Sequence, residues 1–419
     1  MTNVLIYHKR QNALIGGDCY LPLALAAELQ KTCNVTLVTN EGFDVAAASR
    51  TFGVDVDVSR LDIVRISSGG FFQRTFKGLE PIFTARKLKA LSRAADICIS
   101  TLNIIDFGKP AHHFICILSN IEGKAFQDYA RNVRTRTGLR RKARKLGTWF
   151  AENVVKPLFG IRPVRKIVAD ARERIYPTSR YVDRMLRGYF GPFNGAVFYP
   201  PTTFDFPESG EARDPLKVVC IGRVFPPKRV TEIISTVERA RALSGKDLTL
   251  DIAGDLPPSP YSDLIRDLAA RNCWISLKGA LYGDDKRRFL QSGTYAVHGQ
   301  RDEAFGIAVT EYLKAGVVPV VPDAGGSCEV VDNPALAYHS VEDAARILAR
   351  LVCDAPFRED MVRHCGMRAR TFSCGAYMDR QHALVAEIAG RPFPLARNAA
   401  SSCRLRSSDR SSRSSDVST

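Results

Sequence analysis

Short apolar runs rich in Val and Ile alternate with amphipathic stretches along most of this chain, and this alternation is its most constraining feature. The first unit has a run at 4–7, an amphipathic stretch at 20–31 and a second run at 35–38. A strand, a helix and a strand in this order predict a parallel sheet, because parallel strands need a long crossover connection. Further candidate strands lie at 62–66, 96–100 and 114–118.

A second series of the same kind follows the segment 201–214, which holds two prolines, one glycine and four acidic residues. Such a segment suits an exposed hinge, and 419 residues are enough for two domains. We therefore expect an α/β fold with two doubly wound domains, at 1–200 and 215–373, that face each other across a cleft. The second series has expected strands at 218–221, 248–253, 274–277, 295–297 and 318–321, with helices at 232–243, 262–271, 286–291 and 305–315. A last helix is expected within 374–390, and a disordered Ser/Arg-rich tail over 391–419.

The composition excludes several classes of protein. Hydrophobic residues make up 45% of the chain and charged residues 25%, as in ordinary globular proteins. Its eleven cysteines are scattered singly without metal-ligand spacing, which predicts reduced thiols in the cytoplasm. The first residues lack the apolar core of a secretory signal, and no run of about 18 apolar residues suggests a membrane span.

The formal net charge of +16 is concentrated in one stretch. Residues 131–170 hold twelve Lys and Arg against Glu152 and Asp170, with Trp149 and Phe150 among the interleaved apolar residues. This mixture favours adsorption to an anionic membrane surface, so that the protein would be peripheral on the cytosolic face. The alternative is a solvated helix packed on the first domain. Nucleic acid is a less favoured partner because no known binding module accompanies the charge.

Two glutamates flank the start of one predicted helix. If this helix runs from about Gly306 to Gly316, Glu303 lies in the preceding loop and Glu311 in the second turn, about 7–8 Å along the axis from Gly306. Two carboxylates at this spacing could accept hydroxyls at the two ends of an anionic ligand whose charge meets the helix N-terminus. Considered alone, two solvated glutamates on a surface helix would explain the pattern equally simply.

A cationic loop follows a predicted strand of the second series. Gly222 and Arg223 begin this loop and Lys228 ends it, at a carboxyl edge of the sheet. Open α/β sheets bind ligands at this edge, and cations there suit a diphosphate. Taken alone, such a short pattern also arises by chance.

In combination, these motifs resemble family 4 of the glycosyltransferases, which have the GT-B fold of two Rossmann-like domains with a C-terminal helix that crosses back. The resemblance covers most of the chain and is tightest from Val218 to Cys374. Its motifs occur in the family's order: G-R-x4-K at 222–228, I-A-G-D at 252–255, E-x7-E at 303–311, A-G-x-x-P-V at 315–320 and G-G at 325–326. Weaker matches are G-G at 16–17, P-T-S-R-Y-V at 177–182 and Y-P-P at 199–201.

The resemblance implies a role for each matching residue. Arg223 and Lys228 would bind the donor diphosphate and stabilise the leaving nucleotide. Glu303 would contact hydroxyls of the donor sugar, and Glu311 the ribose. The sugar and phosphate pocket would be lined by the amides of Phe305 and Gly306 together with Gly16 and Gly17. Members of the family retain the anomeric configuration and commonly work without a metal, with no cofactor besides the nucleotide sugar.

The histidines depart in part from the family's pattern. Members often carry a site histidine near the end of the strand that corresponds to 114–118, whereas here His112 and His113 lie at the start of that strand. A solvated loop position is the favoured interpretation for both. His298 lies at a strand end just before Glu303, where similar sequences also have histidine, and a place near the donor sugar is expected.

Three aspartates resemble sites but are given simpler explanations. Asp55 and Asp57 form a D-x-D, the metal-binding pattern of transferases with the other major fold, but no supporting motif surrounds them. Asp18 is expected to cap the helix that follows it.

The sequence is thus read as a membrane-associating, retaining hexosyltransferase that moves a sugar from GDP-mannose or a UDP-sugar to a glycan or lipid-linked acceptor. Similarity around residues 303–316 leans weakly toward mannosyltransferases. Two alternatives stay open: an inactive GT-B scaffold or binding subunit at a membrane surface, and a nucleotide-sugar epimerase.

Overall fold

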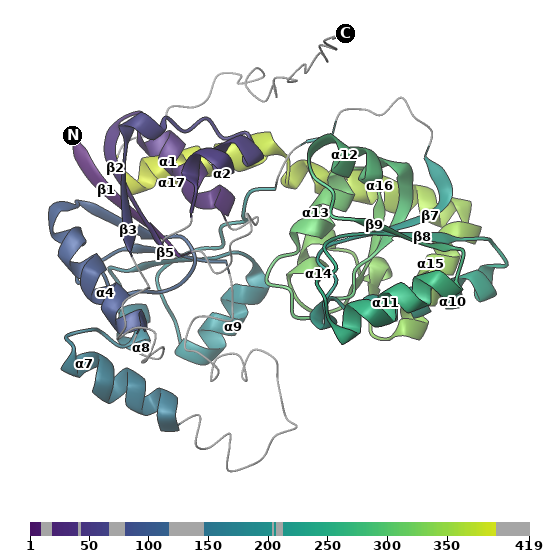
Figure 1. The fold of residues 1–419 in the computed structure, drawn as a ribbon, viewed down its shortest axis with the longest axis horizontal. Helices are drawn as coiled ribbons and strands as arrows, with labels where there is room; N and C mark the ends of the chain where they lie inside the picture. Colours follow the sequence, from purple (N-terminus) through teal and green to yellow (C-terminus); the bar gives the residue numbers. More distant parts are fainter. Residues whose placement is uncertain are drawn as a thin grey trace, which may run out of the picture.

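The computed structural model describes residues 1–9, 19–40, 43–66, 80–116, 146–202, 205–206 and 213–390. These residues form two α/β domains joined side by side (Figure 1). Each domain has a six-stranded sheet in which the paired strands are parallel. The α/β class and the two facing domains are confirmed.

The N-terminal sheet has the order β3-β2-β1-β4-β5-β6. Its central strand β1 pairs in register with β2, so that Val4 lies opposite Val35. The Val and Ile side chains of β1 are buried, as expected for a parallel strand covered on both faces. The strands are β1 Thr2–His8, β2 Cys33–Asn40, β3 Leu61–Ile66, β4 Ile97–Ser100, β5 His112–Ile115 and β6 Arg174–Pro177.

Helices cover both faces of this sheet. The first of them, α1, is buried around almost its whole circumference because the last helix of the chain packs against it. Helix α9 starts at Ser179, whose hydroxyl accepts the Val182 N–H and caps the first turn. The helices of this domain include α1 Tyr20–Leu29, α2 Val45–Phe52, α4 Glu80–Leu91, α7 Lys156–Leu158, α8 Val164–Val168 and α9 Arg180–Phe190.

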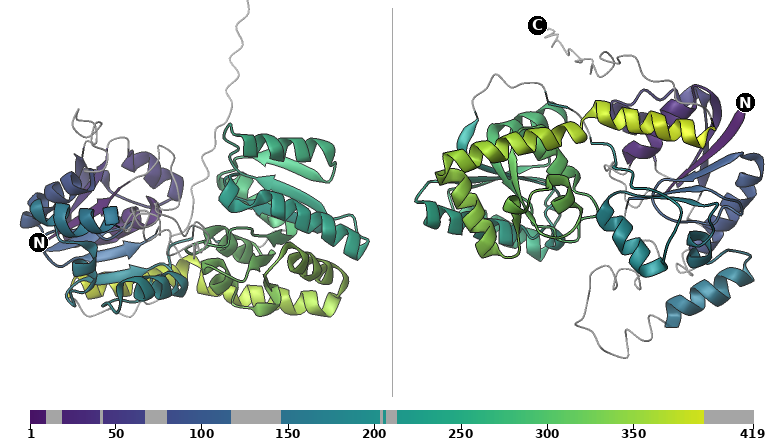
Figure 2. Two further views of the ribbon diagram at one scale, coloured as in Figure 1. Left: turned by 90° about the horizontal axis from the view of Figure 1, so that it is seen from below. Right: turned by 180° about the vertical axis from the view of Figure 1, so that it is seen from behind.

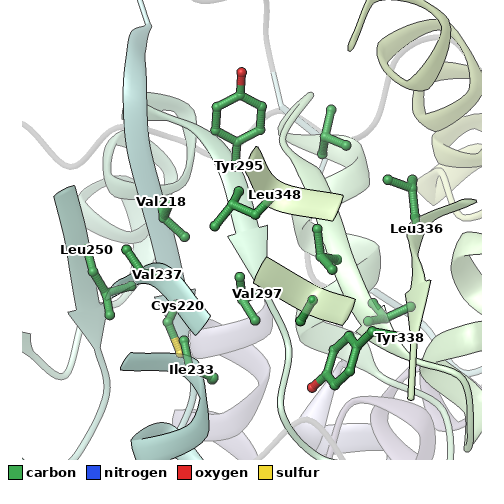
Figure 3. Packing of buried hydrophobic residues seen from close by; sticks show 14 of the residues in the cluster. Val218, Cys220, Ile233, Val237, Leu250, Tyr295, Val297, Leu336, Tyr338 and Leu348 are labelled. Atoms are coloured by element: carbon green, nitrogen blue, oxygen red, sulfur yellow. The ribbon is translucent and has the colours of Figure 1, made fainter. Parts of the chain in front are cut away.

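The C-terminal sheet has the order β12-β11-β10-β7-β8-β9. Figure 3 shows its apolar face, where Val218 of β7, Leu250 of β8 and Tyr295 of β10 pack against helix residues such as Val237 and Leu348. The strands are β7 Asp214–Ile221, β8 Thr249–Ala253, β9 Ile275–Gly279, β10 Gly293–Val297, β11 Val318–Pro322 and β12 Ala337–Tyr338. The helices are α10 Val230–Ser244, α11 Pro260–Arg271, α12 Gly283–Ser292, α13 Ile307–Lys314, α14 Gly326–Val331, α15 Val341–Cys353 and α16 Ala355–Thr371.

The last helix, α17 (Cys374–Ile388), leaves the C-terminal domain and lies along the N-terminal one (Figures 1 and 2). Tyr377, Leu384 and Ile388 belong to the apolar core formed by β1, β2 and α1. Gln381 Nε2 donates a buried 2.7 Å hydrogen bond to the Ala24 carbonyl oxygen. The expected crossing helix is therefore confirmed.

The strands expected between 218 and 321 all form, with ends that differ from the expected ones by a few residues. The boundaries proposed for the domains remain a prediction. The proposed hinge, 201–214, lies between α9 and β7, and six of its residues, 207–212, are among those outside the described part. The predicted tail, 391–419, also lies outside the described residues.

Candidate functional site

A cavity of about 240 Å³ lies where the two domains meet, at the carboxyl ends of the strands. Leu21, Cys116 and Thr178 form its N-terminal wall. The crossover contributes Pro200 and Pro201, and the C-terminal domain contributes Lys228, Glu303, Ala304, Phe305, Gly306, Ile307 and Ala308. Several of the residues predicted for the donor site therefore lie together in an interdomain cleft.

Glu303 is the most strongly perturbed carboxyl of this cavity. Its Oε2 accepts a 2.7 Å hydrogen bond from Lys228 Nζ and lies 3.2 Å from His298 Nε2. Burial alone would raise its pKa, but contact with His298 and the charge of Lys228 outweigh burial and lower the pKa to about 2. Glu303 is therefore ionised at neutral pH and can only accept hydrogen bonds.

His298 follows β10 and is almost completely buried. Its N–H donates to the Val320 carbonyl oxygen, and its own carbonyl oxygen accepts from the Tyr338 hydroxyl, so neighbouring strands fix its backbone. Burial lowers the pKa of His298 below its usual value, despite the carboxylate of Glu303 beside it. A neutral imidazole next to an ionised carboxylate results.

Glu311 lies one helical turn into α13, as the sequence predicts. Its side chain is only 4% exposed, and its Oε1 accepts a 2.6 Å hydrogen bond from Lys286 Nζ of α12. Burial of this ion pair argues against the interpretation of Glu303 and Glu311 as two solvated surface glutamates. Helix α13 thus presents its N-terminus to the cavity and a paired carboxylate farther along.

Closely packed backbone around two glycines holds the Glu303 loop in place. The Gly326 N–H donates to the Glu303 carbonyl oxygen over 2.8 Å. A Cβ at Gly326 would lie 2.5 Å from the Ala304 carbonyl oxygen, too close for any other residue. Gly306 has φ +104°, a conformation that favours glycine, and it begins α13.

The cationic loop after β7 is shaped by its neighbour β8. Gly222 has φ +141°, and a Cβ at Gly254 would lie 1.9 Å from the Gly222 carbonyl oxygen, so the I-A-G-D motif needs its glycine for close approach. Lys228 reaches the cavity from this loop. Arg223 is exposed, lies beside the Phe225 ring at 5.7 Å and does not line the described cavity.

Other predicted residues lie elsewhere. Gly16 and Gly17 fall outside the described residues, as does Asp18. His112 and His113 are the first two residues of β5, at the opposite end from Cys116. The expectation that they occupy a solvated loop is wrong: His113 is fully buried and its Nε2 lies 3.0 Å from Glu173 Oε2.

His112 and the D-x-D have structural roles. His112 Nδ1 lies 3.1 Å from the Tyr176 hydroxyl, and the two rings are stacked. Asp57 accepts the Ser59 N–H and caps a short 3-10 helix. Neither residue lines the described cavity.

Among the site residues that were not predicted from the sequence are Lys286, Cys116 and Thr178. Lys286 lies on an expected helix, but only the fold brings it to Glu311. Cys116 lies just past the end of β5 and lines the cavity. Thr178 gave no signal beyond its place in the P-T-S-R-Y-V motif, and its buried hydroxyl has no hydrogen-bond partner among the described residues.

Comparisons with known proteins agree with this arrangement. Residues 201–365 match the family described as Glycosyl transferases group 1. A Saccharomyces cerevisiae (strain YJM789) protein, the GPI3 subunit of phosphatidylinositol N-acetylglucosaminyltransferase, is 26% identical over 142 residues, which are 34% of this chain and 31% of the yeast protein. The chain thus spans about a third of the length of the curated relatives that it matches.

Solved structures are similar over nearly the whole chain. Sucrose-phosphate synthase from Thermosynechococcus elongatus has a TM-score of 0.65 at 14% identity, and the match covers 93% of this chain and 100% of the synthase chain. Anabaena Alr3699/HepE in complex with UDP and glucose has a TM-score of 0.63 at 12% identity, with coverage of 92% and 100%. At these identities the likeness shows the fold, which is GT-B. Residues 201–365 thus match the group 1 glycosyltransferases by sequence, and the chain as a whole has the GT-B fold.

Proposed function

We propose that this chain is a retaining hexosyltransferase that uses a nucleotide sugar and places the sugar on a glycan or lipid-linked acceptor. The observation that carries the proposal is the pairing of Lys228 with Glu303 in the interdomain cavity, with Glu311 one turn into the adjoining helix. A donor would lie with its sugar toward Glu303 and its nucleoside toward Glu311. The acceptor would enter from the N-terminal domain.

Each charged group has a distinct task in this proposal. The ionised Glu303 carboxylate accepts hydrogen bonds from sugar hydroxyls and thereby orients the sugar. Lys228 and Arg223 meet the diphosphate, whose charge grows as the bond between the anomeric carbon and the phosphate oxygen breaks. The N–H groups that begin α13, near Gly306, face the same anion and stabilise it further.

Lys228 therefore has two partners in turn. When no donor is bound it pairs with Glu303, and when the donor binds it pairs with the phosphate. Lys228 and Glu303 are 19% and 21% exposed, so a ligand can reach both. His298 keeps Glu303 in place when Lys228 turns toward the phosphate, because its backbone is fixed by Val320 and Tyr338.

The proposal names only the chemical class of the donor and of the acceptor. The Anabaena structure similar to this chain holds UDP and glucose, which supports a UDP-sugar, while the similarity around residues 303–316 leans weakly toward mannosyltransferases. The yeast relative is a subunit of a transferase named for phosphatidylinositol, which supports a lipid-linked acceptor. Within the described residues, no three His, Cys, Asp or Glu side chains gather as a metal site, and independence from metal remains a prediction.

The helical stretch 146–158, which ends with α7, supports a peripheral place on an anionic membrane. Four of its apolar side chains are 52–79% exposed: Leu146, Trp149, Phe150 and Leu158. Exposure of so many neighbouring apolar side chains to water is unfavourable and is typical of an interaction surface. The stretch lies at the outer edge of the N-terminal domain (Figure 1). Lys156, Arg165 and Lys166 lie within or just after it, whereas residues 131–145 lie outside the described part. No helix of the described residues is long and apolar enough to cross a bilayer.

Thermal unfolding with a panel of UDP- and GDP-sugars tests the donor site. One nucleotide should raise the Tm of the wild type by several degrees, as expected when ligand exceeds Kd by about 100-fold. Arg223→Ala and Glu311→Ala should abolish the rise, and Glu342→Ala, at an exposed ion pair of α15, should keep it. A folded wild type that responds to no nucleotide would refute the proposal and favour the inactive scaffold.

Sedimentation with lipid vesicles tests the membrane surface. The wild type should bind vesicles with anionic phosphatidylglycerol and not pure phosphatidylcholine, and Trp149→Ala with Phe150→Ala should weaken binding. The matched control changes two exposed apolar side chains of the C-terminal domain, Leu264 and Met367, to Ala. Equal binding by both double variants would contradict this part of the proposal.

A further inference from the structure

A polar contact joins the two domains through one carboxylate. Glu329 lies on α14 of the C-terminal domain, and its carboxylate accepts the backbone N–H groups of Arg180 and Tyr181 at 3.0 and 3.1 Å. Those N–H groups belong to the first turn of α9 in the N-terminal domain. The Tyr199 hydroxyl donates to the same carboxylate over 2.8 Å, and the side chain of Glu329 is only 10% exposed.

A second contact lies beside the first. The Ser179 hydroxyl caps α9 by accepting the Val182 N–H, and it donates a 2.6 Å hydrogen bond to the Ala304 carbonyl oxygen across the domain boundary. The N-terminus of α9 is therefore held twice by the C-terminal domain: by Glu329 at its N–H groups and by Ala304 at its cap.

Both contacts adjoin the walls of the cavity. Thr178, the residue before Ser179, forms part of the N-terminal wall, while Glu303 and Phe305 on either side of Ala304 form the opposite wall. Helix α14 also holds the Glu303 loop, through the Gly326 N–H. One short helix thus carries both the contact to the N-terminal domain and the support of the Glu303 loop.

The chain crosses between the domains at the same place. Tyr199 precedes the crossover prolines, and its ring lies 5.7 Å from Phe305 and 5.5 Å from Phe372, which is next to α17. The polar contacts and both covalent connections are close together, so this is the natural pivot for movement of one domain against the other.

We propose that Glu329 is a positioning residue that fixes the N-terminal domain at this pivot and sets the distance between Thr178 and the Glu303 loop. A carboxylate suits the task because two N–H groups at a helix start lack partners inside the helix and carry the positive end of its dipole. Arg180 Nε, 3.7 Å from Glu329 Oε1, adds to the attraction. Where it concerns catalysis, this inference rests on the function proposed above.

Glu329→Ala leaves the donor-binding side chains in place and frees the two domains to rotate. Small-angle X-ray scattering of the full chain without ligand should show a larger radius of gyration and a broader distance distribution than the wild type. With a donor that binds, kcat should fall about tenfold or more because the two walls lose their alignment. The Kd of UDP or GDP should stay within about threefold, since the charged side chains proposed to bind the nucleotide, Arg223, Lys228 and Glu311, all lie in the C-terminal domain.

Tyr199→Phe is the second variant, because it removes one hydroxyl and keeps the ring against Phe305 and Phe372. It should show the same changes in radius of gyration, distance distribution and kcat as Glu329→Ala, but smaller ones. Ser179→Ala breaks both a cap and the contact to Ala304, whereas the control Ser340→Ala breaks only the cap of α15, through the Asp343 N–H. Glu342→Ala is the control for the loss of a charge within the C-terminal domain.

Scattering separates the two ideas. If the wild type binds no nucleotide, the proposed function fails. The scattering without ligand still tests whether Glu329 fixes the N-terminal domain at the pivot. Wild-type scattering curves for both Glu329→Ala and Tyr199→Phe would overturn the inference, as would a scattering change of equal size in Ser340→Ala or Glu342→Ala. If Glu329→Ala fails to fold, Tyr199→Phe alone decides it.

Discussion

At the residue scale, the chemistry of the cavity depends on the negative charge of Glu303 and on the two side chains, Lys228 and His298, that contact its carboxylate. Lys228 and His298 both meet Oε2 of Glu303, and their contact keeps its pKa near 2 although the carboxyl is mostly buried. An ionised carboxylate cannot donate a proton at neutral pH. Glu303 is thus suited to orient hydroxyls and unsuited to act as a general acid.

The pH dependence of stability follows from this pKa. The unfolded carboxyl, with an ordinary pKa of 4.5, binds protons at higher pH than the folded one. The contribution of Glu303 is therefore complete above that value and is lost as the pH falls toward 2. The difference in unfolding free energy between wild type and Glu303→Gln should shrink by at most ~3 kcal/mol over this window.

Urea denaturation at several pH values between about 6 and 3 measures this difference. Glu342→Gln, at the exposed pair with Arg239, should follow the wild type throughout. A wild type and a Glu303→Gln protein whose stabilities stay parallel over the whole range would show that the carboxyl is not held ionised by its neighbours.

At the scale of elements, Gly326, the first residue of α14, determines where the Glu303 loop lies. Gly326→Ala would place a Cβ 2.5 Å from the Ala304 carbonyl oxygen and 2.6 Å from Phe305 Cα, and backbone atoms cannot yield as a flexible side chain does. The variant should lose about 1–3 kcal/mol of stability, as overpacked sites do, and should bind the nucleotide more weakly.

Calorimetric titration and thermal unfolding check both effects. Gly366→Ala is the matched control: this glycine lies inside α16 with nothing within 4 Å of its added Cβ. There alanine should raise stability by about 0.5–1 kcal/mol, because it has the better helix propensity, and leave nucleotide binding unchanged. Loss of binding in both variants would mean that the Glu303 loop is not what Gly326 controls.

Local sequence patterns predicted much of the fold and only part of the cavity. Helix α13 forms as the glycines at 306 and 316 indicate, because helix ends are determined by nearby residues. The bond between Lys286 and Glu311 joins two elements of one domain, and the one between Glu329 and Arg180 joins residues 149 positions apart in different domains. No periodicity or spacing records contacts of this kind, since they arise only after the sheets have packed.

Buried histidines show the same limit. Because His113 lies at the start of an expected strand and away from the family's site position, the sequence favours a solvated loop for it, yet it is buried in β5 against Glu173. The strand β6 that brings Glu173 close was not predicted either. A buried histidine with a distant carboxylate partner therefore has no signature in its own neighbourhood.

At the scale of the whole molecule, α17 is the element that ties the two ends of the chain together. Leu384 is 5% exposed within the core of the N-terminal domain. Leu384→Ala should destabilise that domain by about 2–4 kcal/mol, through lost burial and the cavity left behind. Hydrogen exchange should therefore accelerate in β1 and β2 more than in β7 and β8.

Met378→Ala serves as the comparison on the same helix, because that side chain is 37% exposed. It should change exchange in either sheet only slightly. Acceleration confined to the C-terminal sheet in Leu384→Ala would contradict the assignment of α17 to the N-terminal core.

The position of α17 also determines the order in which the protein can be completed during synthesis. Domains generally fold as units while the chain emerges, the first one made being the first to fold. Here α1 packs on β1, β2 and α2, but the part of its surface that faces α17 has no cover until residues 374–388 have been made. The C-terminal domain, whose two sheet edges and helices lie within one continuous stretch, can close earlier. The domain that leaves the ribosome first is therefore finished last, and the apolar surface that α17 will cover stays exposed during that interval.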